Sequence, residues 1–174
     1  MPRSAPAPDN PAHHQPVREN PPLPDDQPPR AASAALLTGY QVDDQVGFLL
    51  RRASQRHTAL FQEAMAPLDL TPTQFTALVK LVEHGRLTQN LLGRLAAMDP
   101  ATIQGVVGRL LARALIARSR DPMDRRTVVL APTEAGLALA ARAVTIAQRI
   151  TETTIAPLDA AERSRFLSLL RKLA

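Results

Sequence analysis

The stretch from Asp99 to Gly136 constrains the fold more than any other part of this 174-residue chain. Asp99 is a residue type that caps the start of a helix, and Pro100 follows at the first helical position, where its missing N–H costs nothing. Apolar residues then recur at helical spacing and predict one buried stripe, formed by Ile103, Val106, Val107, Leu110 and Leu111. The other side is small or polar, so this helix is suited to lie close against a polar surface.

The segment from Ala117 to Leu130 has a different period from the helix before it. Two extended arms flank a charged tip that contains proline, which predicts a two-stranded hairpin with Arg120, Arg125 and Arg126 near its end. A groove-reading helix followed by a basic hairpin indicates a winged helix-turn-helix. We therefore expect a mainly α fold with a small β-hairpin wing, flanked by dimerisation helices.

The same stretch resembles the signature of the MarR-type transcription regulators. The residues that carry the resemblance are Arg109, Leu110, Leu115, Ile116, Arg118, Asp121, Asp124, Arg126, Leu130, Thr133 and Gly136. The resemblance extends from about Val42 to the C-terminus. One departure is that the family usually places glycine at the end of the recognition helix, where this chain has Ala114. Glycine is favoured there because it adopts the left-handed conformation without penalty.

Helices are predicted on both sides of the winged helix-turn-helix, which we assign to residues 71–131. Residues 42–66 and 133–174 carry more apolar surface than one small domain hides, so we interpret them as dimerisation helices. A monomeric helical bundle is the alternative. Together, residues 36–174 form the expected MarR-type domain. Residues 1–35 hold ten of the sixteen prolines and are expected to be a disordered tail.

Charge and composition narrow the possible functions. Residues 80–126 carry nine Lys or Arg against four Asp or Glu, a concentration of positive charge that is typical of a nucleic-acid surface. An ordinary solvated basic face is the alternative. The chain has no cysteine, which excludes disulfides and thiolate metal sites. It has no apolar run of about 18 residues, so no membrane span is predicted and we expect a cytoplasmic protein.

The start of the recognition helix is expected to read DNA, because helix-turn-helix dimers place this end in the major groove. The residues placed nearest the bases are Pro100, Ala101, Thr102, Gln104 and Gly105. Gln104 is the best candidate for direct readout, since a side-chain amide can bond adenine through two hydrogen bonds.

Arginines around the helix and along the wing are expected to meet the DNA backbone. Those predicted to contact phosphates are Arg94, Arg109, Arg120 and Arg125. The resemblance implies that Arg126 is the minor-groove arginine of the wing and that Asp124 orients its guanidinium through a charge-assisted bond. A simple turn salt bridge is the alternative for this pair.

His57 interrupts the apolar stripe of the first long helix and is the main ligand-binding candidate. Taken alone, such a histidine is more often a core residue, but the resemblance implies an effector between the dimer helices and the DNA-binding lobe. Ser54 and Phe61 share its face, Arg56 lies at its edge, and Gln148 interrupts the helix that follows the wing. These residue types suit a planar aromatic acid. Residues 45–61, 70–75 and 89–99 resemble the family branch that controls catabolism of nicotinate-type or indoleacetate-type acids.

No enzyme is predicted, because the chain has no phosphate-binding glycine loop, no metal-ligand spacing among its histidines and no Ser/His/Asp arrangement. We expect a homodimeric repressor that binds a pseudo-palindromic operator on double-stranded DNA and needs no cofactor. A small aromatic carboxylic acid should release it by favouring a dimer state that fits the operator poorly. An activator or effector-independent regulator is one alternative, and a helical dimer that binds another protein is a second.

Overall fold

The computed structural model describes residues 37–173, which belong to two compact units that divide between Val42 and Asp43. The predicted tail, residues 1–35, lies outside the described residues. The described part of the first unit is a short turn, in which the Tyr40 N–H donates to the Leu37 carbonyl at 2.9 Å. Gly39 takes a positive φ of 80° there.

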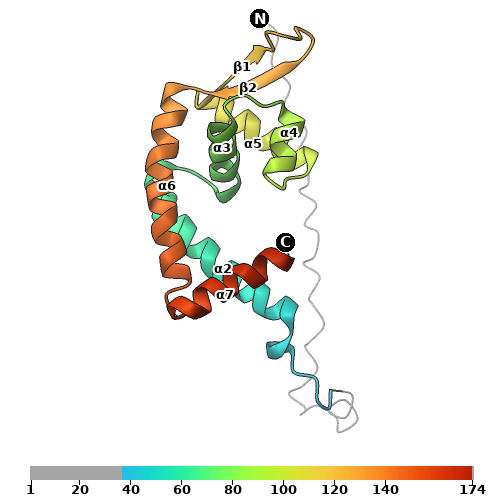
Figure 1. Cartoon of the computed structure of the whole chain (residues 1–174), viewed down its shortest axis with the longest axis vertical. Coiled ribbons are helices and arrows are strands. Elements are labelled where there is room, and N and C mark those ends of the chain that lie inside the picture. Colours follow the sequence, from blue (N-terminus) through green and yellow to red (C-terminus); the bar gives the residue numbers. More distant parts are fainter. Residues whose placement is uncertain (1–36, 174) are drawn as a thin grey trace, which may run out of the picture. The chain divides into compact units, whose positions relative to one another are not determined.

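The order of elements matches the expected mainly α fold with one hairpin (Figure 1). The elements are η1 (Val42–Asp44), α2 (Val46–Met65), η2 (Ala66–Leu68), α3 (Pro72–His84), α4 (Gln89–Leu95), α5 (Pro100–Ala112), β1 (Ile116–Arg120), β2 (Val128–Pro132), α6 (Glu134–Thr154) and α7 (Ala160–Leu173). The hairpin precedes the N-terminal end of α6, and α7 follows its C-terminal end (Figure 1).

Side chains cap the starts of several helices, including the Asp99 cap that the sequence predicts. Thr71 and Gln74 form a reciprocal capping box at α3, and Thr88 accepts a backbone hydrogen bond at the start of α4. Asp99 caps α5 and Thr133 caps α6 in the same way. Each cap satisfies backbone donors that a helix leaves unpaired at its start, so short local motifs set the limits of these helices.

The wing is an antiparallel pair in which Ile116 lies opposite Pro132 and Arg120 lies opposite Val128. On the other side of β2, Leu87 exchanges two backbone hydrogen bonds with Leu130, at 3.1 and 2.8 Å. This bridge ties the segment between α3 and α4 to the hairpin. With α3, α4 and α5 in place, the region has the architecture of a winged helix-turn-helix.

One apolar cluster holds this region together. Its members from α3, α4, α5 and the hairpin are almost fully buried: Leu78, Leu81, Leu92, Val106, Val107, Leu110 and Leu130. Val106, Val107 and Leu110 belong to the stripe predicted for the recognition helix. The polar side of α5 is therefore left at the surface.

The turn after α5 forms without the glycine that is usual there. Ala114 takes the left-handed conformation with φ 52°, and the Leu115 N–H donates to the Leu110 carbonyl at 3.0 Å. This is the hydrogen bond of a Schellman cap. A left-handed alanine costs about 1 kcal/mol relative to glycine, so the departure affects stability and leaves the turn geometry in place.

A second apolar cluster lies between α2 and α6 and includes Phe61, Met65, Leu68, Leu70 and Ile150. The N-terminal half of α2 and the whole of α7 contribute no buried residue. Their large apolar side chains are exposed in the single chain, among them Leu49, Leu50, Leu169 and Leu173. This is the surface that the sequence analysis attributes to a dimer.

Within residues 37–173, none of the helices has the length and apolar content that crossing a membrane requires.

Candidate functional site

The start of α5 presents a capped, exposed helix end. One carboxylate oxygen of Asp99 accepts the backbone N–H groups of Ala101 and Thr102 at 3.0 and 2.9 Å, and the other accepts the Thr102 hydroxyl at 2.5 Å. The Thr102 hydroxyl and then its backbone N–H hold the pKa of Asp99 below its usual range. The cap thus stays ionised at neutral pH and fixes the orientation of the first turn.

The predicted base-reading residues lie together on this first turn and a half. Pro100, Ala101 and Gln104 are exposed, whereas Thr102 and Gly105 are half-buried. The Thr102 hydroxyl already donates to Asp99, which the sequence analysis did not foresee. The Gln104 side chain is therefore the exposed amide of this face, in the position from which a recognition helix contacts base edges.

Two of the predicted phosphate-binding arginines flank this face. Arg109 is exposed and its guanidinium lies against Gly105, where an added Cβ would be 3.5 Å from Nη1. Arg94 lines a hollow of about 310 Å³ between α4 and the start of α5, together with Asn90, Met98 and Pro100. Both cations are placed beside the reading face by elements that the apolar cluster holds rigidly.

Asp124 shapes the wing tip, and its contacts there differ from those predicted. Asp124 accepts the backbone N–H of Arg126 at 3.0 Å and the hydroxyl of Thr127 at 2.8 Å, so it shapes the turn and does not hold the Arg126 guanidinium. Among the described residues, neither the expected charge-assisted pair nor its salt-bridge alternative is formed. An aspartate two residues upstream competes well for a free backbone N–H in a turn.

The same hydrogen bonds set the charge state of the tip. The backbone N–H of Arg126 and then the Thr127 hydroxyl hold the pKa of Asp124 below its usual range. Arg120 donates to the Arg126 carbonyl at 3.3 Å and so braces the base of the tip. Arg125 and Arg126 are exposed, and across residues 37–173 their guanidinium groups have no protein partner.

Arg86 is a basic residue of this surface that the sequence analysis missed. It precedes Leu87, whose backbone pairs with β2, and its guanidinium donates to the Ser119 hydroxyl of β1 at 3.1 Å. The signal that could have found it is the extended Arg86–Leu87 segment between two helices. A third strand-like segment beside the hairpin places its basic side chain next to the wing.

His57 lies on α2 opposite the C-terminal turn of α6, and its tautomer can be derived from its partner. The Thr154 hydroxyl donates to the Ile150 carbonyl at 2.7 Å, so its only hydrogen is used. The 2.9 Å contact between His57 Nδ1 and the Thr154 oxygen must therefore have Nδ1 as the donor. In the neutral ring this leaves Nε2 as an acceptor, and among the described residues it has no partner.

Two adjoining hollows share His57 and Thr151. The smaller, about 180 Å³, lies between α2, α3 and α6 and is lined by Phe61 and Phe75, whose rings meet edge to face at 5.6 Å. The larger, about 360 Å³, is almost wholly apolar and lies between α2, α6 and α7, with Ser54 and Phe166 in its lining. The structure thus brings together three predicted ligand residues: Ser54, His57 and Phe61.

The other two predicted ligand residues do not line these hollows. Arg56 donates from Nη1 to the Thr154 carbonyl at 2.9 Å and from Nη2 to the Thr153 carbonyl at 3.3 Å, which caps the C-terminus of α6. Gln148 is exposed on another face of α6. Phe75, Thr151 and Thr154 were missed, because only the packing of α2 against α3 and α6 brings them beside His57.

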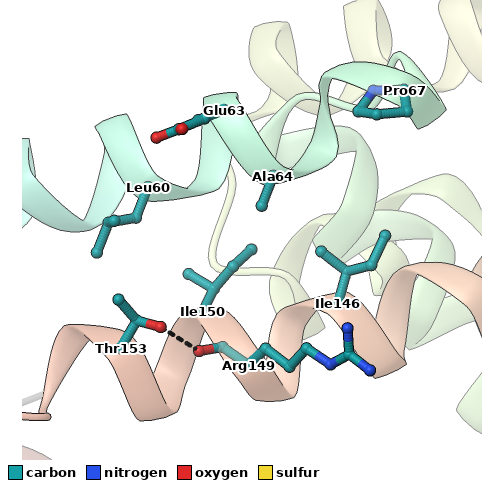
Figure 2. A pocket seen from close by; sticks show the side chains of 8 residues that line it. All are labelled: Leu60, Glu63, Ala64, Pro67, Ile146, Arg149, Ile150 and Thr153. Atoms are coloured by element: carbon teal, nitrogen blue, oxygen red, sulfur yellow. Dashed lines mark hydrogen bonds between the residues drawn. The ribbon is translucent and has the colours of Figure 1, made fainter.

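A third hollow of about 500 Å³ lies on another side of the α2–α6 pair (Figure 2). Leu60 and Ala64 of α2 face Ile146 and Ile150 of α6, with Glu63 on one rim and Arg149 on the other (Figure 2). Ile150 also lines the smaller hollow beside His57 and is only 4% exposed. This buried side chain therefore lines both hollows.

No group of three His, Asp or Glu side chains within residues 37–173 is placed to hold a metal ion. The exposed, capped recognition helix and the basic wing define a winged-helix DNA-binding protein, and a hollow lies at His57 on the helices that flank the wing.

Comparison with known proteins agrees with this class. Residues 70–128 match the model of the MarR family. The chain is 46% identical over 136 residues to the HTH-type transcriptional repressor NicR of Pseudomonas putida KT2440, covering 78% of this chain and 86% of NicR. The chain belongs to the MarR family, and it is a transcription regulator, not an enzyme.

Two solved structures are also similar. A probable transcriptional regulator from Pseudomonas aeruginosa has a TM-score of 0.74 and 46% identity, over 77% of this chain and 100% of that one. BpsR of Bordetella bronchiseptica, described for regulation of its DNA binding by 6-hydroxynicotinic acid, has a TM-score of 0.73 and 43% identity, over 77% and 96%.

Proposed function

We propose that this protein is a homodimeric repressor that binds a pseudo-palindromic operator and leaves it when a small aromatic carboxylic acid binds. The observation that carries the proposal is the pairing, in one chain, of an exposed recognition helix with a hollow around a histidine that retains a free acceptor. NicR is named a repressor, and the DNA binding of BpsR is described as regulated by an aromatic acid. The cytoplasm, where bacterial DNA lies, is the proposed compartment.

The DNA contacts are assigned by position on the winged helix-turn-helix. We propose that the first turns of α5 enter the major groove, with Gln104 reading a base and Pro100, Ala101, Thr102 and Gly105 allowing close approach. Arg94, Arg109, Arg120 and Arg125 would contact phosphates, and Arg126 would enter the minor groove beside the wing. Asp124 would act by shaping the tip through backbone hydrogen bonds.

The effector is assigned to the hollow shared by His57, Phe61 and Phe75. A planar ring would pack against the Phe61–Phe75 pair in the wall of the hollow, and its carboxylate or ring hydroxyl would meet His57 Nε2. A protonated His57 would donate to a carboxylate, whereas a neutral one would accept from a hydroxyl. Ser54 would contribute a second polar group from the adjoining hollow, Arg56 would hold the end of α6 in place, and no role follows for Gln148 from its position.

The dimer is assigned to the exposed apolar faces of α2 and α7. In the single chain these faces leave Leu49, Leu50 and Leu169 open to water, which is unfavourable for a contiguous patch. A two-fold interface would bury them and place two recognition helices about one DNA turn apart. Residues 36–174 would then form one functional domain, and no cofactor would be needed.

The test is a DNA-binding titration on the DNA upstream of the gene for this protein, with and without 6-hydroxynicotinic acid and related aromatic acids. We expect tight binding that weakens steeply between 50 and 200 mM salt, by about 10³-fold or more if six or more phosphates are contacted, and that one acid reverses. Binding that no acid disturbs would remove the effector pocket from the proposal. Absence of sequence preference would favour the protein-binding alternative.

A variant of His57 tests the pocket itself. His57→Ala should reduce the effect of the acid on operator binding while leaving affinity for DNA without the acid within about twofold, because His57 lies outside the winged region. The matched control is His84→Ala, which removes a histidine at the exposed end of α3. If His57→Ala responds normally to the acid and only melts at a lower temperature, His57 is a packing residue.

A further inference from the structure

Hydrogen bonds connect the C-terminal end of the recognition helix to the helices on both sides of the winged region. On one side, the Thr133 hydroxyl at the start of α6 donates to the Ala114 carbonyl at 2.7 Å, and the Thr133 N–H donates to the Leu115 carbonyl at 3.1 Å. A Cβ at Gly136 would lie 2.0 Å from that same Leu115 oxygen, so the approach is as close as the backbone allows.

On the other side, one arginine makes the connection. Arg113, the C-cap residue of α5, donates from Nη1 to the Asp69 carbonyl and from Nη2 to the Leu68 carbonyl at 3.0 Å. Its Nη1 also lies 3.7 Å from a carboxylate oxygen of Asp69, which is largely exposed. The two carbonyl hydrogen bonds are therefore the main contact, and the ion pair contributes little.

The segment that Arg113 holds packs against side chains that line the effector hollow. Leu68 and Leu70 are buried in the same cluster as Phe61 and Ile150, which line that hollow. Asp69 takes the left-handed conformation between them, with φ 48°. A shift of this cluster moves the carbonyls of residues 68 and 69, and a guanidinium that holds two carbonyls in a fixed fork follows them.

We propose that Arg113 is a positioning residue that couples the effector hollow to the recognition helix. It contacts neither DNA nor ligand, and it sets the tilt of α5 according to where the η2 turn lies. This inference rests on the proposed function, because it assumes that an acid in the hollow changes operator binding. If Arg113 only stabilised the fold, it would make the same contacts, but its replacement would not change the response to the acid.

The experiment measures operator affinity with and without saturating 6-hydroxynicotinic acid, and acid affinity by calorimetry, for the full chain and three variants. Arg113→Met removes the guanidinium and its two carbonyl hydrogen bonds but keeps an unbranched apolar side chain. Arg113→Lys keeps the charge and one donor, and serves if the first variant fails to fold. Asp69→Asn is the matched control, because it removes the weak ion pair while asparagine tolerates the left-handed conformation.

We expect Arg113→Met to bind the acid within about twofold of wild type, while the factor by which the acid weakens operator binding falls by about fivefold or more, within the range usual for allosteric coupling. Arg113→Lys should fall between, and Asp69→Asn should behave as wild type. If the acid weakens operator binding of Arg113→Met by the same factor as in wild type, this inference alone is overturned. The same holds for Arg113→Lys if only that variant folds. A wild-type protein that binds its operator but ignores the acid overturns the effector half of the proposed function and this inference with it.

Discussion

The winged region and the helices that flank it differ in how much of their apolar surface one chain can bury. Leu110 of α5 is 0% exposed and sits among other fully buried side chains, whereas Leu169 of α7 is 49% exposed. α2 shows both states along its length, since Phe61 and Met65 are buried and Val46 and Leu49 are not. The winged region therefore has a complete core within one chain. The flanking helices can bury their apolar faces only against another surface.

The largest expected effect on stability comes from truncating a leucine of the winged region, compared with truncating a leucine of the flanking helices. Leu110→Ala should lower the free energy of unfolding by about 3 kcal/mol, because it leaves a cavity in a closely packed core. Leu169→Ala should cost the isolated chain much less and instead weaken dimerisation. Thermal melts at several protein concentrations distinguish the two. Equal, concentration-independent losses would contradict the comparison.

A second prediction concerns the wing alone. Arg126→Ala should lower operator affinity about tenfold and reduce the salt dependence by about one counterion per protomer, because an exposed cation without a protein partner is lost from the DNA surface. Sedimentation should show an unchanged dimer. The matched control is Arg142→Ala on α6, an exposed arginine away from the wing. Normal operator binding by Arg126→Ala would remove the wing arginine from the mechanism.

A third prediction concerns the turn that ends the recognition helix. Ala114→Gly should raise the free energy of unfolding by about 1 kcal/mol, because glycine takes the left-handed conformation at φ 52° without a Cβ clash. Chemical denaturation measures this directly. Ala112→Gly, two residues earlier at the last position of α5, should destabilise, because glycine is unfavourable in a right-handed helical conformation. A destabilised Ala114→Gly would mean that the turn geometry is not the one described.

The smallest expected effect is a pH dependence at the start of α5. Because the pKa of Asp99 is lowered in the folded protein, its contribution to stability is present above the pKa of the unfolded chain and is lost as pH falls through the folded value. The melting-temperature difference between wild type and Asp99→Asn, which caps without titrating, should therefore shrink below about pH 4. A difference that stays constant from pH 6 to pH 3 would show that ionisation of Asp99 does not contribute.

Features set by neighbours in the sequence could be predicted, and features set by distant contacts could not. The cap at Asp99 and the apolar stripe of α5 involve residues within a few helical turns, and the structure has them as expected. The expected contact between Asp124 and the Arg126 guanidinium is not formed, because the backbone N–H of Arg126, two residues away, competes for the same carboxylate.

The rest of the candidate site depends on how separate elements pack. Arg113 and the carbonyl of Leu68 are 45 residues apart, and Arg56 and the carbonyl of Thr154 are 98 apart. Local patterns contain no information on such pairs. Sequence reasoning accordingly found His57 as a polar interruption, but it assigned Arg56 to a ligand when its guanidinium is occupied by the end of α6.

The most direct test of the account is whether the acid and the operator oppose each other's binding. Calorimetry would measure the affinity of 6-hydroxynicotinic acid for the free protein and for the protein saturated with operator DNA. The account predicts weaker binding to the operator complex, by the same factor by which the acid weakens operator binding, since coupling between two sites is reciprocal. Equal affinity for the free and DNA-bound protein would contradict it.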